Sequence, residues 1–518
     1  MWFALREPPV HLMIALHSAI PETLPRRGAS SMKKASSTVI RAGLLSLALV
    51  ATTAADECNP NYSGVTLDVG TRTRPFIASA IEMAAKGWEK RTCGKINILE
   101  FPVDQLYQTY LGALVAGEGK FDVITFGPFW TPDFAPYLSD MPASMRGTES
   151  WNDILPVYRD RLMVWNGRYL SQTIDGDQHI LYYRLDLFTN PQERQRFKEK
   201  YGYDLAPPAT WAQYYQIAEF FNRPAANLWG TAEAYRRGGE QFWYFFTHAA
   251  AYTHHPKLPG SMFFDPDTLD AQINNPGWVK ALEDYINGLN VAPPGALGFT
   301  SADIHNIFAG GSVAMNFDWG DTGVNAADAK TSLIPGKVGT AMLPGSKQVW
   351  NYKTKQWDAF PTVSHAPFLA FGGWQAAVPA NSNHIEAAWN FIAWLASPDV
   401  SGEAVVTPQA GINPYRQSHF DRERWLKLFT PEEATLYLDA QRESLQSPNV
   451  ALDLRIPGHY AYTQALEVQL TRALSFEISP QEALNNVAKA WNALTDRFGH
   501  DKQRAAYRAS MGLDSEVK

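Results

Sequence analysis

The stretch between residues 65 and 126 constrains the fold most strongly, because strand-like and helix-like patterns alternate along it. Short runs rich in β-branched and aromatic residues alternate with longer segments in which apolar residues recur at helical spacing. Strands are predicted over residues 65–69, 95–101 and 121–126, and helices over residues 75–94 and 105–117. A strand–helix repeat of this kind predicts a parallel, doubly wound α/β sheet, in which ligands bind at the carboxyl ends of the strands.

The rest of the chain continues the α/β pattern and ends in a helical region. Strands are predicted over residues 180–183, 312–317 and 375–378, and helices over residues 211–222, 301–309, 385–396, 461–474 and 480–498. No internal repeat or low-complexity linker separates these segments. We therefore expect two α/β domains joined by several short crossovers.

Composition narrows both the class of protein and the class of ligand. The chain has 45 Lys and Arg against 52 Asp and Glu, and this acidic excess argues against a nucleic-acid partner. The only unbroken apolar run is short and lies near the N-terminus, which excludes a polytopic membrane protein. The chain has 17 tryptophans although only 19% of its residues are charged. Flat aromatic faces beside a modest set of carboxylates suit a ligand with apolar CH faces and hydroxyl edges.

Residues 1–55 resemble an upstream extension followed by a signal peptide. Met32 precedes a basic stretch with Lys33 and Lys34, then a short apolar run over residues 43–50 and a small-residue stretch that ends before Asp56. The apolar run has about eight residues, against the ~20 needed to span a bilayer. We expect translation to start at Met32 and the mature protein to be exported to the periplasm or secreted.

The chain has two cysteines, Cys58 and Cys93, and both lie after the predicted leader. In an oxidising compartment, an isolated pair this close in sequence favours one disulfide. Two free, buried thiols are the alternative.

Sequence signatures of enzymes are missing. No GxGxxG follows a strand, and the chain contains no phosphate loop, HExxH, EF-hand loop or GxSxG elbow. No catalytic residue, metal site or cofactor is therefore predicted. The aromatic run over residues 242–246 favours core packing, with Trp243 as the candidate exception.

Three patches at predicted strand ends combine acidic residues or glycine with aromatic residues. They are Asp175-Gly-Asp177, Asp318-Trp319-Gly-Asp321 and Gly372-Gly-Trp374. Carboxylates accept strong hydrogen bonds from hydroxyl groups, an indole face covers the CH patch of a sugar, and glycines permit close backbone approach. The combination indicates carbohydrate recognition.

Seven segments resemble, in the same order, the family of extracellular solute-binding proteins that serve bacterial ABC importers of sugars, the maltose-binding-protein-like group. They are Gly117–Ile124, Ile180–Phe188, Ala206–Trp211, Phe308–Met315, Gly372–Ser382, Ala387–Ser397 and Asn413–Arg416. The resemblance covers essentially the whole mature chain. It departs from many members in extra residues around 190–206 and 344–366 and in Phe121, where those members have proline.

The resemblance implies a type II-like periplasmic-binding-protein fold, with two discontinuous α/β lobes, a hinge of several crossings and a helical C-terminal region. The lobes would comprise residues 56–173 with 322–396, and residues 174–321 with 397–518. It also implies a monomer that binds a carbohydrate or polyol without catalysis and delivers it to ABC permease subunits. The implied ligand-binding residues are Trp130, Asp175, Asp177, Trp319, Trp374 and Arg416, with Asp318 and Trp243 as further candidates.

The competing function is a secreted glycoside hydrolase that uses a pair of carboxylates. Such enzymes place one carboxylate on each side of the glycosidic bond. Asp175 and Asp177 are two residues apart at one strand end, so both would face the same side of a sugar. This arrangement favours binding over hydrolysis.

Overall fold

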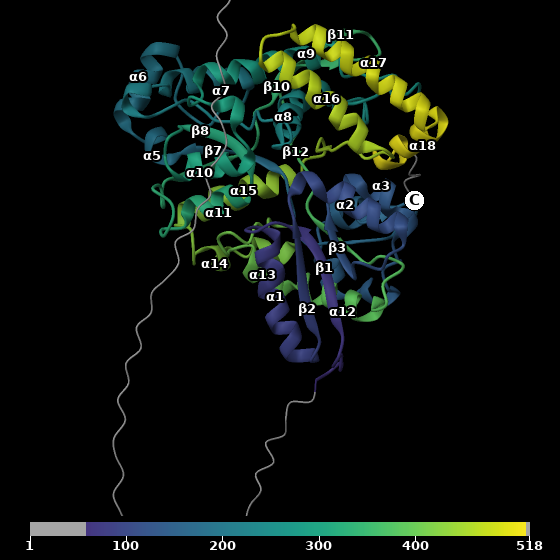
Figure 1. The fold of residues 1–518 in the computed structure, drawn as a ribbon. Coiled ribbons are helices and arrows are strands. Elements are labelled where there is room, and N and C mark those ends of the chain that lie inside the picture. The colour runs from purple at the N-terminus through teal and green to yellow at the C-terminus, as the bar shows by residue number, and fades with distance from the viewer. Residues whose placement is uncertain (1–57, 514–518) are drawn as a thin grey trace, which may run out of the picture. The chain divides into compact units, whose positions relative to one another are not determined.

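A computed structural model describes residues 58–513 (Figure 1). The predicted leader, its cleavage site and Met32 lie outside the described residues. Within residues 58–513, no helix combines the length and the apolar character that a membrane crossing requires.

The first sheet contains the predicted parallel core. Strands β1 (Thr66–Arg72), β2 (Lys95–Phe101) and β3 (Val123–Phe126) are parallel, with β1 between the other two. Helices α1 (Ile77–Thr92) and α2 (Val103–Ala116) connect them, as the sequence predicts. Strands β13 (Gln375–Ala377) and β6 (Gln172–Thr173) extend the sheet beyond β3 in antiparallel orientation.

The second sheet has β7 (His179–Arg184) at its centre, with β8 (Met315–Trp319) and β9 (Val338–Ala341) antiparallel on its two sides. The position of β9 differs from one expectation. The resemblance implies that residues 322–396 belong to the first lobe, whereas Val338–Ala341 pair with β7 in the second sheet. The signal at β9 was weak: four small or β-branched residues flanked by glycine and proline carry no clear strand pattern.

Helices surround both sheets. Around the second sheet lie α5 (Leu185–Phe188), α6 (Pro191–Tyr201), α7 (Trp211–Phe221), α10 (Ser301–Ala309), α11 (Asp321–Ala327) and α15 (Pro431–Leu445) (Figure 1). Further helices are α3 (Thr131–Phe134), α4 (Glu149–Asn152), α12 (Ile385–Leu395), α13 (Pro398–Ala404) and α14 (Arg422–Trp425), of which α3 packs on α2, α12 on α1 and α14 on α15. Short strand pairs are β4 (Val164–Trp165) with β5 (Arg168–Tyr169), and β12 (Phe368–Leu369) with β14 (Ala451–Leu452).

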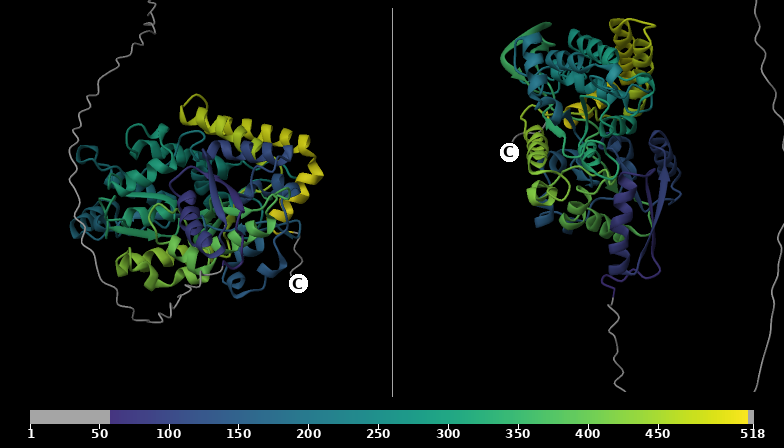
Figure 2. Two further views of the ribbon diagram at one scale, coloured as in Figure 1. Left: turned by 60° about the horizontal axis from the view of Figure 1, so that its bottom comes forward. Right: turned by 90° about the vertical axis from the view of Figure 1, so that its left-hand side faces the viewer.

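The helical C-terminal region predicted from the sequence is present. Helices α16 (His459–Leu474), α17 (Pro480–Phe498) and α18 (His500–Ser510) lie at the end opposite β1 and β2 (Figure 2). Helix α16 packs on α8 (Gln241–Thr253), α17 packs on α9 (Pro276–Gly288), and α18 packs on α17. A hairpin of β10 (Ser346–Asn351) and β11 (Gln356–Ser364) also packs on α8.

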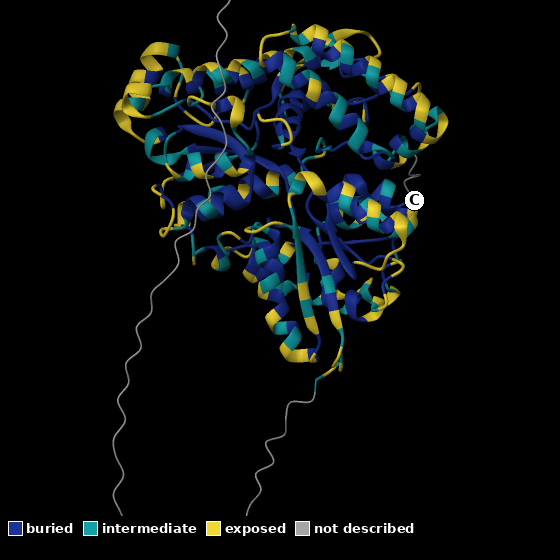
Figure 3. Ribbon diagram, in the orientation of Figure 1, coloured by how far each residue is buried: buried dark blue, intermediate teal, exposed yellow. Residues whose placement is uncertain are grey.

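The core follows the sheets and α8 (Figure 3). Every residue of α8 is buried, so the aromatic run at 242–246 belongs to the core, as expected. The predicted disulfide joins Cys58 to Cys93, with 5.7 Å between the two Cα atoms.

Three chain crossings lie together between the two sheets. The segments around residues 174–178 and 370–374 lead from one sheet to the other, and the segment 411–416 leads from α13 to α14 and α15, the latter packed on β9. The Ile174 N–H donates to the carbonyl of Trp374 at 2.9 Å, and the Asn413 N–H donates to Asp175 at 2.6 Å. A Cβ atom on Gly373 would lie 2.0 Å from the Asp175 carbonyl oxygen. Gly373 therefore allows the backbones of these two segments to approach closely, whereas the predicted role of the glycines beside a ligand stays a prediction.

Candidate functional site

A small cavity lies between the two sheets, beside the three crossings. Its volume of about 30 Å³ leaves room for little more than one water molecule. Side chains from β1, α1, α10, β8, α11, the crossings and the residue that precedes α8 reach it. The lining residues are Arg72, Phe76, Ile77, Asp177, Glu240, Ser301, His305, Trp319, Asp321, Phe371, Trp374 and Gly411.

Aromatic rings form one part of the cavity wall. The Phe371 and Trp374 rings stack with centroids 4.8 Å apart. The guanidinium of Arg72 lies 4.9 Å from the Phe76 ring centroid and 5.8 Å from that of Trp374. The Trp319 indole N–H donates to the carbonyl of Ala370 at 3.0 Å, which fixes this ring. A ligand in the cavity would therefore meet ring faces whose orientation is already set.

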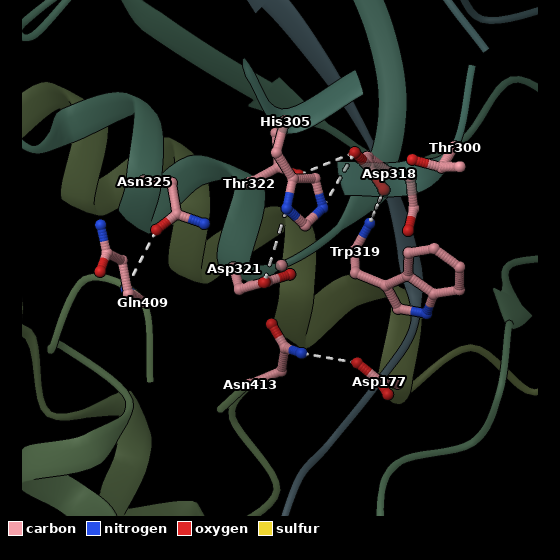
Figure 4. A network of polar contacts seen from close by, with 12 residues as sticks. Asp177, Thr300, His305, Asp318, Trp319, Asp321, Thr322, Asn325, Gln409 and Asn413 are labelled. Atoms are coloured by element: carbon pink, nitrogen blue, oxygen red, sulfur yellow. Dashed lines mark hydrogen bonds and ion pairs between the residues drawn. The ribbon is translucent and has the colours of Figure 1, made fainter. Parts of the chain in front are cut away.

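His305 lies between two carboxylates at another part of the wall (Figure 4). Its Nε2 is 3.2 Å from Asp318 Oδ2, and its Nδ1 is 3.9 Å from Asp321 Oδ2. Burial by itself would lower the pKa of His305, but the negative charges of Asp318 and Asp321 outweigh burial and raise it to about 9. His305 is therefore a cation at neutral pH.

Asp318 is fixed by three further hydrogen bonds. Its Oδ1 accepts from the Tyr244 hydroxyl and from the Trp319 N–H, each at 2.9 Å, and its Oδ2 accepts from Thr322 at 2.8 Å. The carboxylate is fully buried, so it orients its neighbours and does not itself line the cavity.

Asp175 and Asp177 share a partner from the third crossing. The side-chain amide of Asn413 donates to Asp177 Oδ1 at 2.7 Å and to Asp175 Oδ1 at 3.2 Å. Burial raises the pKa of both carboxyl groups, and the charge of Asp175 raises that of Asp177 further. Of the two, Asp177 lines the cavity and Asp175 lies within the crossing behind it.

The cavity brings together three of the eight predicted ligand-binding residues, Asp177, Trp319 and Trp374. Asp175 and Asp318 lie directly behind it, through the shared contacts with Asn413 and His305. The other three predicted residues, Trp130, Trp243 and Arg416, do not line it.

These three residues have other partners. Arg416 is buried and donates to the backbone carbonyls of Ser150, at 2.6 Å, and Ala396. The Trp243 indole N–H donates to Asp453 at 2.6 Å, and its ring packs 5.3 Å from Phe371. Trp130 packs against Tyr107 and Phe134, with centroids 5.4 and 6.0 Å away. Each of these side chains therefore packs or bonds within the protein away from this cavity, and a ligand contact of any of them stays a prediction.

Several lining residues were not predicted, among them Arg72, Phe76, Glu240, His305 and Phe371. One signal could have found Arg72, because it ends β1, and the carboxyl ends of parallel strands are where such sheets bind ligands. Glu240 and His305 come from helices, where an acidic or imidazole side chain carries no positional signal.

No metal centre accompanies this site. Across residues 58–513, no three His, Cys, Asp or Glu side chains form a group that could hold a metal ion.

The raised pKa of His305 predicts a fall in stability at alkaline pH. Because the folded protein holds this proton more tightly than the unfolded chain does, the stabilisation is complete below pH 6.5 and is lost as pH rises through about 9. The shift corresponds to about 3 kcal/mol of unfolding free energy. Urea unfolding at pH 6.5 and pH 9.5 should show this difference.

The variant His305→Gln should lose most of that pH dependence. The matched control is His500→Gln, since the side chain of His500 is 42% exposed. The control should show the same loss of unfolding free energy between pH 6.5 and pH 9.5 as the wild type. If His305→Gln also shows that same loss, the ion pairs of His305 with Asp318 and Asp321 do not stabilise the fold.

Two sheets joined by three crossings, with a polar and aromatic cavity between them, define a two-lobe binding protein of the periplasmic type. The model of the family "bacterial extracellular solute-binding protein" matches residues 73–401. The chain belongs to this family, so the resemblance seen in the sequence is confirmed.

Similar proteins support the same assignment. A mannitol-binding protein of Pseudomonas aeruginosa is 25% identical over 400 residues, which cover 74% of this chain and 82% of that protein. Among solved structures, a solute-binding protein from Agrobacterium radiobacter K84 in complex with ribitol has a TM-score of 0.68 at 20% identity, covering 84% of this chain and 100% of that one. Maltose-bound MalE3 from T. maritima has a TM-score of 0.67 at 22% identity, covering 83% and 100%. These likenesses confirm the predicted two-lobe fold.

Proposed function

We propose that the chain is the ligand-capturing component of an ABC importer, that it binds a small polyol or monosaccharide in the cavity between its sheets, and that it delivers this ligand to membrane permease subunits. The proposed location is the periplasm, after export by the N-terminal leader, and the proposed active form is a monomer without catalysis. The observation that carries the proposal is the composition of the cavity wall, which combines the carboxylates Asp177, Glu240 and Asp321 with the Trp319, Phe371 and Trp374 rings.

This combination suits a polyhydroxyl ligand. Carboxylates accept charge-assisted hydrogen bonds from hydroxyl groups, and ring faces cover the carbon chain that carries them. Micromolar affinity requires about −8 kcal/mol net. A few hydrogen bonds to charged groups, each worth ~1.5–3 kcal/mol, together with stacked rings, can supply that.

The proposed roles follow the distance of each residue from the cavity. Asp177, Trp319 and Trp374 would touch the ligand, while Asp175 and Asp318 would hold Asn413 and His305 in place. The first lobe would carry the sheet of β1–β3, β13 and β6, and the second lobe the sheet of β7–β9. Because the cavity has room for little more than one water molecule in this structure, the lobes would open about the three crossings to admit the ligand and close over it.

The ligands of similar proteins favour a polyol. The relative from P. aeruginosa is a mannitol-binding protein, and one similar structure holds ribitol. A further similar structure, from Agrobacterium vitis S4, holds D-mannitol at a TM-score of 0.65 and 19% identity, covering 84% of this chain and 99% of that one.

Calorimetry against D-mannitol, D-glucitol, ribitol, D-tagatose and maltose should detect at least one small polyol or monosaccharide with a Kd of about 10 µM or tighter. Chromatography of each protein–ligand mixture after incubation should find the ligand chemically unchanged. The variant Asp177→Asn should weaken binding of that ligand by about tenfold or more, because it replaces one carboxyl oxygen at the cavity wall by an amide nitrogen that cannot accept a hydrogen bond. The variant Asp140→Asn serves as the control, since the Asp140 side chain is 65% exposed and pairs with Arg168. Absence of binding across the panel, or release of hydrolysis products from maltose, would contradict the proposal.

A further inference from the structure

We propose that the cavity rejects anionic sugars, such as aldonic and uronic acids, and accepts polyols that carry an amino group. The inference rests on the proposed function, because it concerns the same cavity. It specifies which charge a polyol ligand can carry.

Carboxyl groups outnumber cationic groups around the cavity. Asp177, Glu240 and Asp321 line it from the first crossing, the start of α8 and the start of α11. Two further carboxyl groups, those of Asp175 and Asp318, lie directly behind this wall. Two cationic side chains, Arg72 and His305, line the same space.

His305 is already paired within the protein. Its ring lies between Asp318 and Asp321 (Figure 4), so its positive charge is balanced before a ligand arrives. The residue is only 7% exposed, and neither ring nitrogen makes a hydrogen bond of good geometry among the described residues. An acceptor on the ligand, such as a hydroxyl oxygen, can therefore take a hydrogen bond from this buried, positively charged ring.

Arg72 is the one lining cation without a salt bridge among residues 58–513. Its guanidinium lies over the Phe76 and Trp374 rings. Burial raises the pKa of both Asp177 and Asp321, and the positive charge of Arg72 opposes this rise at each of the two groups. One guanidinium shared between two carboxylates leaves no excess positive charge for a third.

The burial of the cavity wall makes this charge imbalance important for specificity. Most of the side chains that line the cavity are buried, so a bound ligand is largely removed from bulk water and from counterions. A ligand carboxylate would lose its water and lie next to protein carboxylates, and such like-charge contacts are strongly unfavourable. An ammonium group would instead form charge-assisted hydrogen bonds with the same side chains.

A set of ligands with one carbon skeleton tests the inference. Calorimetry at pH 7.5 would compare D-glucitol, its 1-amino-1-deoxy derivative and D-gluconate, with the corresponding D-mannitol and ribitol sets measured in parallel. For the alditol that binds most tightly, we expect the aldonate to bind at least about 100-fold more weakly, and the amino-alditol to bind within about tenfold of the alditol or more tightly.

The variant Glu240→Gln should reduce the preference of the protein for the alditol over the aldonate. Glutamine keeps an acceptor for the Ser301 hydroxyl, which donates to Glu240, but it removes one negative charge. The ratio of aldonate Kd to alditol Kd should fall by about tenfold in this variant. The matched control, Glu403→Gln, alters a surface carboxylate that is 59% exposed and should leave the ratio unchanged.

The outcomes separate the inference from the proposed function. An aldonate that binds within tenfold of its alditol, or an amino-alditol that binds over 100-fold more weakly, would overturn the charge selectivity while the binding function stands. If the ratio of aldonate Kd to alditol Kd is the same in Glu240→Gln as in the wild type, Glu240 does not cause the selectivity, and this result counts against the inference. If no alditol binds at all, the proposed polyol function fails and the inference fails with it.

Discussion

Replacing Trp374 by alanine is expected to weaken ligand binding by about 30- to 1,000-fold and to destabilise the fold as well. Trp374 lines the cavity, yet it is only 3% exposed because its ring stacks on Phe371. The variant would remove a ring face from the ligand and leave a hole beside Phe371. We expect a loss of about 2–4 kcal/mol in binding and of about 3–5 kcal/mol in stability. Calorimetry and urea unfolding on the same preparation measure both.

Trp130→Ala is the matched control for this prediction. Trp130 is also largely buried, at 9% exposure, but its ring packs against Tyr107 and Phe134 and does not line the cavity. This variant should lose a similar amount of stability while its Kd stays within about threefold of the wild type. If Trp374→Ala keeps its affinity, or if Trp130→Ala loses as much, the assignment of the cavity as the binding site is wrong.

The local elements of the fold could be predicted because their signals lie within short windows of sequence. Strand β2 occupies residues 95–101, as predicted, and α10 begins and ends at the predicted residues 301 and 309. Helix α10 has a capping box in which Thr300 and Asp303 bond to each other's backbone N–H groups, and such motifs fix helix ends locally. Strand β9 was not predicted, because its place beside β7 is decided by long-range pairing and not by its own four residues.

The site was predictable only in part, for a related reason. Asp177, Trp319 and Trp374 lie at strand ends or crossings, where topology alone brings side chains to one place. Arg416 and Trp243 have residue types that suit a ligand, but their partners are Ser150, Ala396 and Asp453, which are distant in sequence. Sequence pattern cannot separate an arginine that holds backbone carbonyls from one that faces a ligand, since both are polar groups that need a buried partner.

Replacing Cys58 and Cys93 together by serine is expected to lower the free energy of unfolding by about 4 kcal/mol on the chain-entropy model. The disulfide spans a sequence separation of 35 residues and ties the start of the described chain to the end of α1. Ligand affinity should remain within about twofold, because neither cysteine lines the cavity. Denaturant unfolding of the two proteins, with calorimetry at a temperature where both are folded, tests this expectation.

Other contacts hold the same segment in the folded protein, so the loss should arise mainly in the unfolded chain. The Asn59 N–H donates to the Arg91 carbonyl at 3.0 Å, and the Tyr62 ring stacks 5.8 Å from that of Trp88. The control variant Tyr62→Ala removes a native ring contact but keeps the disulfide, so it should cost less, about 1–2 kcal/mol. If the double serine variant unfolds with wild-type free energy, or if mass spectrometry finds two free thiols in untreated protein, the disulfide does not stabilise this fold.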